Sequence, residues 1–433
     1  MVIIKRSFVS ILMLCLLSGC GQEDEVSAID VFKSSSSVIE TRDQISHLRK
    51  DDIWWTVYGE DMAWNFKNLH RFMPTVNIYR AGAVKPLSSN KNPKIANFQV
   101  DTPDGQMAFE EFLRSDYTTT MGLVILHKGQ IVYEAYPRQE AHEKPVVWSV
   151  AKVFVSSVIA ILEDRGEVDV SKPIDHYISE LSGSVYQGVK IRNILDMASG
   201  VECAEEYVDK ASCYYQYSMS VGDGFFDENS PDNPYKLLAN MKAPNYAEQG
   251  TEFQYSGANT FLLSWLVEEI TEMPFQDALT KEIWSKIGAE SDASYLAPRY
   301  GVPITHGGML ARLRDVARFG LLFTPSYKIV SNEKIISDRY VELLRDGGNE
   351  RLFDKDHASG RIDDEVRYPA YQWDRIHTNN DFYKGGWAGQ GLIVNPDQDT
   401  VVVYTGYFKE DLSEVDMLPI LRELMKSIYG NGD

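Results

Sequence analysis

The stretch SVAKVFVSSVIAIL, residues 149–162, decides the fold, because it places a serine and a lysine directly before a strongly apolar run. We expect a helix over Ser149–Arg165 that Gly166 ends. Residues three apart share one helix face, so the Ser149 hydroxyl and the Lys152 amine can meet. Burial lowers the pKa of a lysine, and a shift from about 10.4 to near 7 costs roughly 4.6 kcal/mol. Lys152 is then a usable base. The alternative is a serine that only caps the helix beside a solvated lysine.

The motif S-x-x-K occurs three times, so spacing alone does not identify the nucleophile. Ser88 and Lys91 lie in a polar loop that contains several asparagines. Ser331 and Lys334 fit a helix N-cap. Of the three copies, that at Ser149 stands before an apolar helix, so we predict Ser149 to be the nucleophile.

A second segment, residues 250–260, places Tyr255 in a loop with glycine and serine before another apolar helix. A phenol there can carry a proton between the nucleophile and the leaving group, provided that neighbouring lysines lower its pKa. A buried core aromatic is the alternative.

A third segment, Lys384-Gly385-Gly386-Trp387-Ala388-Gly389, opens a late hairpin. Its glycines let a strand backbone approach a ligand closely. Lys384 can hold a substrate carboxylate, and the backbone amide of Trp387 can join that of Ser149 in an oxyanion hole. Loss of one such donor costs about 3 kcal/mol of transition-state stabilisation. A glycine bulge on an edge strand is the alternative.

The three segments, in this order, resemble the motifs of the serine β-lactamase and penicillin-binding-protein superfamily. Within it, the chain is most similar to class C-like esterases and amidases of the 6-aminohexanoate-dimer hydrolase group. The similarity covers roughly residues 60–428, and its supporting cues are Asn65–Asn68, Met73–Thr75, Ala198–Val201, Glu205–Tyr207, Tyr371–Trp373 and Gly389-Gln390. The resemblance implies an acyl-enzyme on Ser149, with Lys152 and Tyr255 moving the proton and with Lys384, Gly386 and the Trp387 amide forming the facing wall.

Two departures from the superfamily pattern bear on the substrate. Gly257 stands where many penicillin-recognising members have an asparagine two residues after the tyrosine, and Gly385 replaces the usual hydroxyl residue of the lysine strand. Both changes remove hydrogen bonds to a lactam. We therefore expect an esterase, amidase or peptidase rather than an efficient β-lactamase. A weak β-lactamase or DD-peptidase remains an alternative, as does a catalytically silent surface lipoprotein that binds peptide or glycan.

The rest of the pattern predicts an α+β fold. Hairpins are expected over Met121–Tyr136 and Leu392–Tyr404, and a final helix within Leu412–Tyr429. Between the strands, helices are expected over 190–197, 258–271, 275–287 and 311–323. Strands at both ends with helices between them indicate that terminal segments share one antiparallel sheet, flanked by helices, while the middle forms a helical lobe. The resemblance implies the same β-lactamase/DD-peptidase-like architecture.

The first residues predict export. Lys5 and Arg6 precede a short apolar stretch that ends in Leu17-Ser18-Gly19-Cys20, which looks like a bacterial lipobox. We expect a signal peptide over 1–19, an acylated Cys20 at the start of a flexible tether over 20–50, and one catalytic domain over 51–433. The expected location is the cell envelope, held to a lipid bilayer in the periplasm or at the outer membrane.

Export also makes the cysteines interpretable. Of four cysteines, Cys15 leaves with the signal and Cys20 is acylated, so Cys203 and Cys213 remain for a disulfide in an oxidising compartment. Two free thiols or a metal-binding pair are the alternatives. No spacing of histidines suggests a metal site, and no cofactor is expected. The net charge of −20 argues against a nucleic-acid partner, which leaves a small ester, amide or peptide as the expected substrate.

Overall fold

The structure is a computed structural model that describes residues 36–48, 57–224, 226–352 and 365–430. Cys20, the predicted signal peptide and most of the predicted tether lie outside the described residues. The remaining part of the tether contains a helix that the sequence analysis did not predict, α1 (Val38–Ser46), which has no buried residue and begins with a capping box between Ser37 and Glu40.

Within the described residues, the largest sheet has seven strands in the spatial order β5-β4-β12-β11-β10-β9-β8. Their bounds are β4 (Gly122–His127), β5 (Gln130–Ala135), β8 (Val366–Ala370), β9 (Trp373–His377), β10 (Phe382–Gly386), β11 (Gln390–Asn395) and β12 (Thr400–Thr405). All neighbours are antiparallel. β4 pairs with β12 from Gly122 opposite Thr405 to His127 opposite Thr400. This pairing confirms that segments from both ends of the chain share one sheet.

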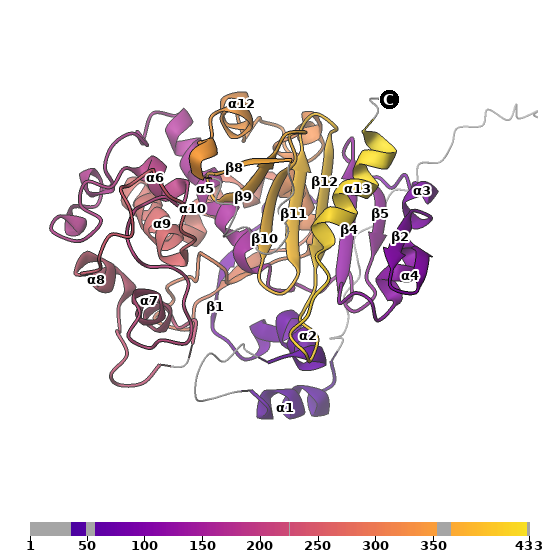
Figure 1. Ribbon diagram of the computed structural model, residues 1–433, viewed down its shortest axis with the longest axis horizontal. Coiled ribbons are helices and arrows are strands. Elements are labelled where there is room, and N and C mark those ends of the chain that lie inside the picture. Colours follow the sequence, from indigo (N-terminus) through magenta and orange to yellow (C-terminus); the bar gives the residue numbers. More distant parts are fainter. Residues whose placement is uncertain (1–35, 49–56, 225, 353–364, 431–433) are drawn as a thin grey trace, which may run out of the picture.

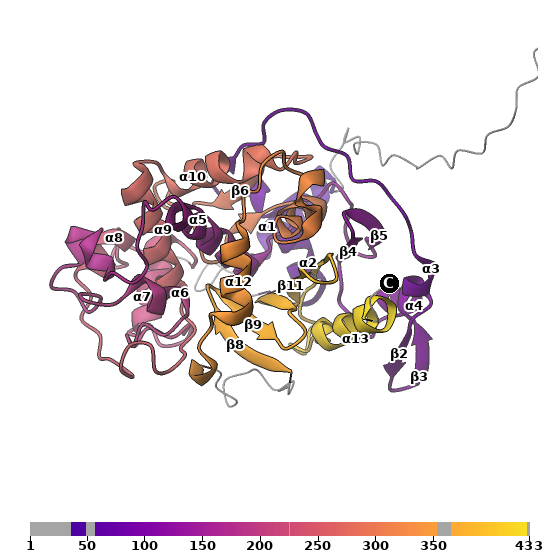
Figure 2. The ribbon, with the colours of Figure 1, turned by 90° about the horizontal axis from the view of Figure 1, so that it is seen from above.

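Both faces of this sheet are buried, and neighbouring residues alternate between two cores. In β12, Val401 and Val403 face the main core, where α11 (Leu313–Leu321) covers the sheet. Val402 and Tyr404 face a second core closed by α13 (Met417–Tyr429). Figure 1 shows α13 lying across the strands. The sheet is therefore the middle layer between two helical layers, as Figure 2 shows from above.

The middle of the chain forms the predicted helical lobe beside the sheet (Figure 1). Its helices are α5 (Lys152–Asp164), α6 (Ile191–Leu195), α7 (Cys213–Val221), α8 (Pro234–Ala239), α9 (Gly257–Thr271) and α10 (Phe275–Glu282). α5 and α9 are apolar nearly all round and pack against each other, so they form the lobe's buried centre. The α+β architecture predicted from the sequence is confirmed.

Smaller elements complete the fold. A three-stranded sheet has the order β1 (Thr75–Ile78), β6 (Ala293–Leu296), β7 (Met309–Leu310), and β2 (Gln99–Thr102) pairs with β3 (Gly105–Ala108). The remaining helices are α2 (Gly59–Asn68), α3 (Pro93–Ala96), α4 (Phe109–Arg114) and α12 (Asp338–Asp346), with 3-10 turns η1 (Leu69–Arg71), η2 (Trp148–Ala151), η3 (Ile174–His176), η4 (Ser179–Leu181), η5 (Trp284–Lys286), η6 (Pro325–Ile329) and η7 (Glu350–Leu352).

Two predicted element boundaries were wrong. The helix expected from Ser149 begins as η2 and becomes α-helical at Lys152, after Trp148 with its positive φ of 42°. Ser331 is not a helix N-cap: its hydroxyl accepts a hydrogen bond from the Glu333 amide, and the true cap of α12 is Ser337.

Candidate active site

Ser149 lies in η2, where the helical lobe meets the sheet. It is half-buried and follows Trp148, whose φ of 42° falls in the left-handed region. A bulky aromatic residue rarely adopts this conformation, and its cost must be met by surrounding packing. The Trp148 ring provides that packing, because it stacks edge-on against Phe66 and Trp387 at centroid distances of 5.5 and 5.8 Å. The turn that presents Ser149 is thus held by aromatic contacts.

Lys152 is fully buried, and its Nζ has three oxygen neighbours. These are Ser149 Oγ at 3.0 Å, the backbone carbonyl of His306 at 2.8 Å and Glu205 Oε1 at 3.4 Å. Burial lowers the pKa of Lys152, while the carboxylates of Glu205 and Asp374 act in the opposite sense. The direction of this shift confirms the prediction from the apolar helix.

The three oxygens match the three N–H donors of an ammonium, with Lys152 donating to each of them. In a neutral amine, two of the oxygens keep a hydrogen from Lys152 and the lone pair can face the third, the Ser149 hydroxyl. Lys152 therefore lies within hydrogen-bond reach of Ser149, as a base for its proton must.

Tyr255 lies across the site from Lys152, in the loop before α9. Its hydroxyl accepts a hydrogen bond of 2.9 Å from Lys384 Nζ. The Nζ atoms of Lys152 and Lys384 lie 4.7 and 4.6 Å from the centroid of its ring. Burial, followed by the charges of Asp374 and Glu205, raises the pKa of Tyr255 well above its usual value. The condition set for this residue in the sequence analysis, that neighbouring lysines lower its pKa, is not met, because desolvation and the two carboxylates raise the pKa. Tyr255 is a phenol that can donate a proton.

Lys384 is fully buried on β10, and its ammonium pairs with the carboxylate of Asp374 on β9. The same carboxylate accepts the Gly385 amide at 2.9 Å. Burial lowers the pKa of Lys384 to about 8, although Asp374 raises it. We expected Lys384 to hold a substrate carboxylate. In the structure its charge is already compensated by Asp374, and its contact is with Tyr255.

Gly386 brings the end of β10 against the turn that carries Ser149. A Cβ added to Gly386 would lie 2.7 Å from the carbonyl oxygen of Val147, so only glycine permits this approach. β9 pairs with β10 at Phe382 and Tyr383 but not at Gly386. The next residue, Trp387, packs on Trp148. The structure therefore places the predicted Lys-Gly-Gly-Trp segment beside the predicted nucleophile.

Gly257, where penicillin-recognising proteins often carry asparagine, has no room for a side chain. A Cβ there would lie 2.5 Å from the Tyr214 hydroxyl and 2.8 Å from the His306 ring. These two buried side chains fill the space that an asparagine would need. The packing around Gly257 therefore excludes the asparagine side chain that would contact a lactam.

Three residues that contact the site were not predicted as members of it: Glu205, His306 and Asp374. Glu205 belongs to one of the family cues in the sequence. His306 is buried, with Nδ1 2.9 Å from the Tyr217 hydroxyl and Nε2 3.4 Å from Asp223. It contacts Lys152 through its backbone carbonyl, which leaves no signature in a sequence. Tyr207 is half-buried with its hydroxyl 3.1 Å from that of Tyr214.

The other two S-x-x-K copies lie outside this site. Ser88 Oγ accepts a hydrogen bond from Gln130, and Lys334 pairs with Asp338. Trp373, which belongs to the family cue Tyr371–Trp373, is buried in the core against Phe323 and Phe382.

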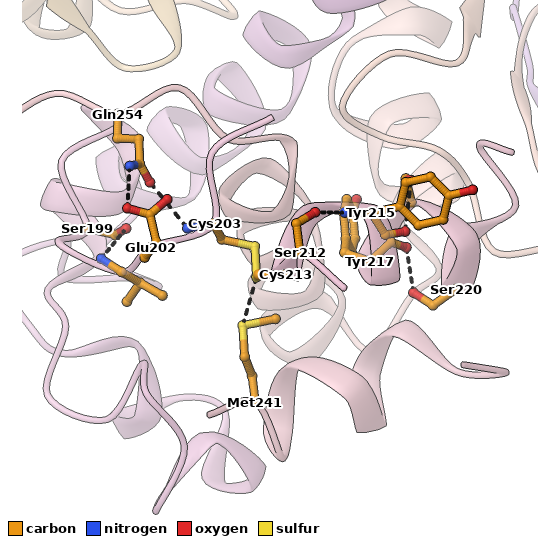
Figure 3. Close-up of a disulfide and its surroundings, with 12 residues drawn as sticks. Ser199, Glu202, Cys203, Ser212, Cys213, Tyr215, Tyr217, Ser220, Met241 and Gln254 are labelled. Carbon is orange, nitrogen blue, oxygen red and sulfur yellow. Dashed lines mark hydrogen bonds between the residues drawn. A yellow bond between two sulfur atoms is a disulfide. The ribbon is translucent and has the colours of Figure 1, made fainter. Parts of the chain in front are cut away.

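Cys203 and Cys213 form the predicted disulfide, with a Cα–Cα distance of 5.2 Å. Figure 3 shows it beside Met241, whose sulfur lies 3.3 Å from Cys213 Sγ. Among the described residues, no group of three His, Cys, Asp or Glu side chains is arranged to hold a metal ion. No helix in that same part of the chain is both long and apolar enough to cross a membrane.

Solved structures share this fold. A candidate 6-aminohexanoate-dimer hydrolase from Bacillus anthracis superposes with a TM-score of 0.72 at 23% identity, covering 85% of this chain and 94% of its own. EstCE1, a hydrolase with promiscuous acyltransferase activity, gives a TM-score of 0.53 at 14% identity, covering 74% of this chain and 96% of its own. These similarities show that the chain has the fold of these hydrolases, a β-lactamase-like fold.

The sequence comparisons define the family. The Beta-lactamase family model matches residues 107–410, which is most of the chain, so this protein belongs to the β-lactamase family. Within the family it is similar to the 6-aminohexanoate-dimer hydrolase of Paenarthrobacter ureafaciens. The two are 28% identical over 343 residues, which cover 78% of this chain and 84% of the relative.

Proposed function

We propose that this protein is a serine hydrolase that cleaves a small ester or linear amide through an acyl-enzyme on Ser149. The observation that carries the proposal is the position of Lys152 Nζ, fully buried and 3.0 Å from Ser149 Oγ. A buried amine whose hydrogens are accepted by other oxygens has its lone pair left for the serine proton. A lysine that merely packed in a core would have no reason to meet a serine at a strained turn.

The contacts support a division of roles between the two proton-handling groups. Ser149 Oγ attacks the carbonyl carbon while its proton passes to the Lys152 amine. The tetrahedral intermediate collapses, and the bond to the leaving oxygen or nitrogen breaks as Tyr255 donates a proton to it. Tyr255 regains a proton from the Lys152 ammonium, and the Lys384 ammonium stabilises the phenolate in the interval. Water, deprotonated by Lys152, then releases the acid and restores Ser149.

The backbone amides of Ser149 and Trp387 are proposed to stabilise the oxyanion. The close packing of β10 on η2, which Gly386 permits, supports this assignment because it brings the two segments to one point. Preorganised amides aimed at developing charge are worth about 3 kcal/mol each in comparable enzymes.

The proposed substrate class rests on two features of the site and one comparison. Gly257 leaves no space for an asparagine that would bind a lactam amide, and Asp374 already neutralises Lys384, which would otherwise attract a carboxylate. The similarity to a 6-aminohexanoate-dimer hydrolase adds linear amides to the candidates. A DD-peptidase or weak β-lactamase is the alternative within the same chemistry.

A substrate panel with matched variants tests the proposal. p-Nitrophenyl butyrate, nitrocefin and a small linear amide dimer are compared for the wild type, Ser149→Ala and Ser88→Ala, which alters an S-x-x-K copy outside the site. We expect ester or amide turnover that falls at least about 10³-fold in Ser149→Ala alone. A fluorophosphonate probe should label the wild type and Ser88→Ala. Equal labelling of Ser149→Ala would favour the silent binding protein instead.

We also propose, from the sequence, that the protein is lipid-anchored through Cys20 in the bacterial cell envelope. The test is fractionation of cells that express the full chain and a Cys20→Ala variant, with an alkynyl fatty acid to label acylated protein. We expect label and membrane association for the wild type. Equal membrane association of the unlabelled variant would refute the anchor.

A further inference from the structure

The two oxygens that fix the Lys152 amine come from separate parts of the chain. Glu205 lies on the segment 203–212, which contains no helix or strand. The carbonyl of His306 belongs to the loop before β7, and the His306 ring is held by the Tyr217 hydroxyl on α7 at 2.9 Å. The position of the amine therefore depends on how the segment 203–212 sits relative to α7.

The segment 203–212 runs directly into α7, and a disulfide joins its first residue to that helix as well. Cys203 is two residues before Glu205, and Cys213 is the first residue of α7, four residues before Tyr217. Figure 3 shows the disulfide bridging the loop and the start of the helix. Glu205 is thus tied to the helix that holds His306.

We propose that the Cys203–Cys213 disulfide is a positioning element of the active site, holding Glu205 and the carbonyl of His306 in place around Lys152. The proposal rests on the proposed role of Lys152 as the base for Ser149. It assigns to the disulfide a role in catalysis beyond stabilising the fold.

Beside the disulfide, the segment contacts α7 through Tyr207, whose hydroxyl lies 3.1 Å from that of Tyr214, while the contacts of Glu205 and Cys203 themselves are weaker. The Glu205 amide donates to the Tyr255 carbonyl at 3.3 Å, and the Cys203 amide donates to the Gln254 side chain at 3.2 Å, both near the long end for hydrogen bonds. The Glu206 carboxylate accepts only amides of its own loop. The Glu205 side chain is 25% exposed, so water competes for its contact with Lys152.

Charged groups reach Lys152 from every element around it. Asp374 on β9 and Asp223 after α7 raise its pKa, as Glu205 does, and Glu205 has the largest effect of the three. Lys384 on β10 is the second lysine of the site, and the charge of Lys152 lowers the pKa of Lys384. Asp374 is fixed by the large sheet, whereas Glu205 is on the crosslinked segment. Opening the disulfide should therefore weaken mainly the attraction of Glu205.

The bond is also within reach of small thiols. A cavity of about 650 Å³ lies against it, lined by both cysteines, Met241 and Glu205 among others. Cys213 is half-buried rather than fully enclosed. A reductant can therefore open the disulfide without prior unfolding of the lobe.

The test is the pH dependence of kcat/KM for an ester substrate, measured on the full chain before and after dithiothreitol and on Cys203→Ser/Cys213→Ser. The attack of Ser149 requires neutral Lys152, so the pKa of Lys152 sets the pH below which kcat/KM falls, which is the acid limb of the profile. Loss of Glu205 lowers that pKa, and the limb should move to lower pH by at least about one unit, which is the effect of a charge pair 3.4 Å apart in bulk water and hence a lower bound for buried Lys152. Glu205→Gln should shift the limb similarly, and reduction of that variant should add little.

Glu202→Gln is the matched control, because Glu202 is adjacent to Cys203 but bonds Gln254 at 3.0 Å instead of Lys152. We expect its acid limb to stay in place. If reduction lowers the melting temperature but leaves the limb unmoved, the disulfide is only structural and the proposal is wrong. The proposal is also wrong if the acid limb of oxidised Glu205→Gln stays where it is in the wild type. It is wrong, too, if Cys203 and Cys213 are free thiols in the native protein. Activity retained by Ser149→Ala would instead refute the proposed function.

Discussion

Adding one methyl group to the strand beside the nucleophile, by Gly386→Ala, is expected to slow hydrolysis severely while changing no polar group. The new Cβ would lie 2.7 Å from the carbonyl oxygen of Val147 and 2.8 Å from Gln390 Cβ. The carbonyl belongs to backbone, so it cannot swing aside. Ordinary contact begins at 3.4 Å, and the difference of 3.4 − 2.7 = 0.7 Å is the distance by which β10 and the Ser149 turn must separate.

The magnitude follows from that separation. A misplacement of about 1 Å between reacting groups costs roughly 10²-fold in rate, so we expect kcat/KM to fall about 30- to 100-fold. Overpacking of this kind lowers stability by about 1–3 kcal/mol. Gly386 does not have a left-handed φ, so the alanine adds steric conflict without backbone strain.

The assay is p-nitrophenyl butyrate hydrolysis with a thermal melt on the same samples. Gly307→Ala is the matched control, because its Cβ would lie 3.4 Å from the Trp148 ring, in ordinary contact, and near wild-type activity is expected. The reasoning fails if Gly386→Ala matches the wild type in both kcat/KM and melting temperature. It also fails if the control loses as much activity as Gly386→Ala.

Four further outcomes are expected. Lys152→Ala should lower kcat/KM about 10³-fold without lowering the melting temperature, since it removes the base and also a buried amine. A variant with a lowered melting temperature that keeps most of its kcat/KM would contradict this role. Tyr255→Phe should slow amide hydrolysis more than p-nitrophenyl ester hydrolysis, because an amine leaving group needs the phenol's proton and nitrophenolate does not. Equal losses of kcat/KM for the two substrates would contradict the role of Tyr255 as proton donor. A basic limb in kcat/KM is expected near pH 8 from deprotonation of Lys384; Asp374→Asn should move it to lower pH, because Asp374 raises the pKa of Lys384, and a shift upward would refute the assignment. Gly257→Asn should destabilise the protein and confer no nitrocefin turnover, because Tyr214 and the His306 ring occupy the space; a stable variant that turns over nitrocefin would show that the packing is not the barrier.

The features that could be predicted from the sequence depend on short-range geometry. Ser149 and Lys152 are three residues apart at a helix start, so their approach follows from helix geometry alone. The antiparallel sheet and the helical lobe follow from periodicity and from the order of strands and helices. The disulfide follows from counting the cysteines that export leaves available.

The features that only the tertiary structure decided arise where distant segments meet. Asp374 reaches Lys384 because β9 and β10 pair with Arg375 opposite Tyr383, and continuing this register sets Asp374 opposite Lys384. The contact of His306 with Lys152 runs through a backbone carbonyl, which every residue type possesses and no motif can mark. The pKa of Tyr255 depends on how deeply its hydroxyl is buried and on how many carboxylates lie near it. The sequence by itself determined which groups carry the proposed chemistry, and packing decided their charge and their partners, because desolvation and long-range contacts exist only in the folded chain.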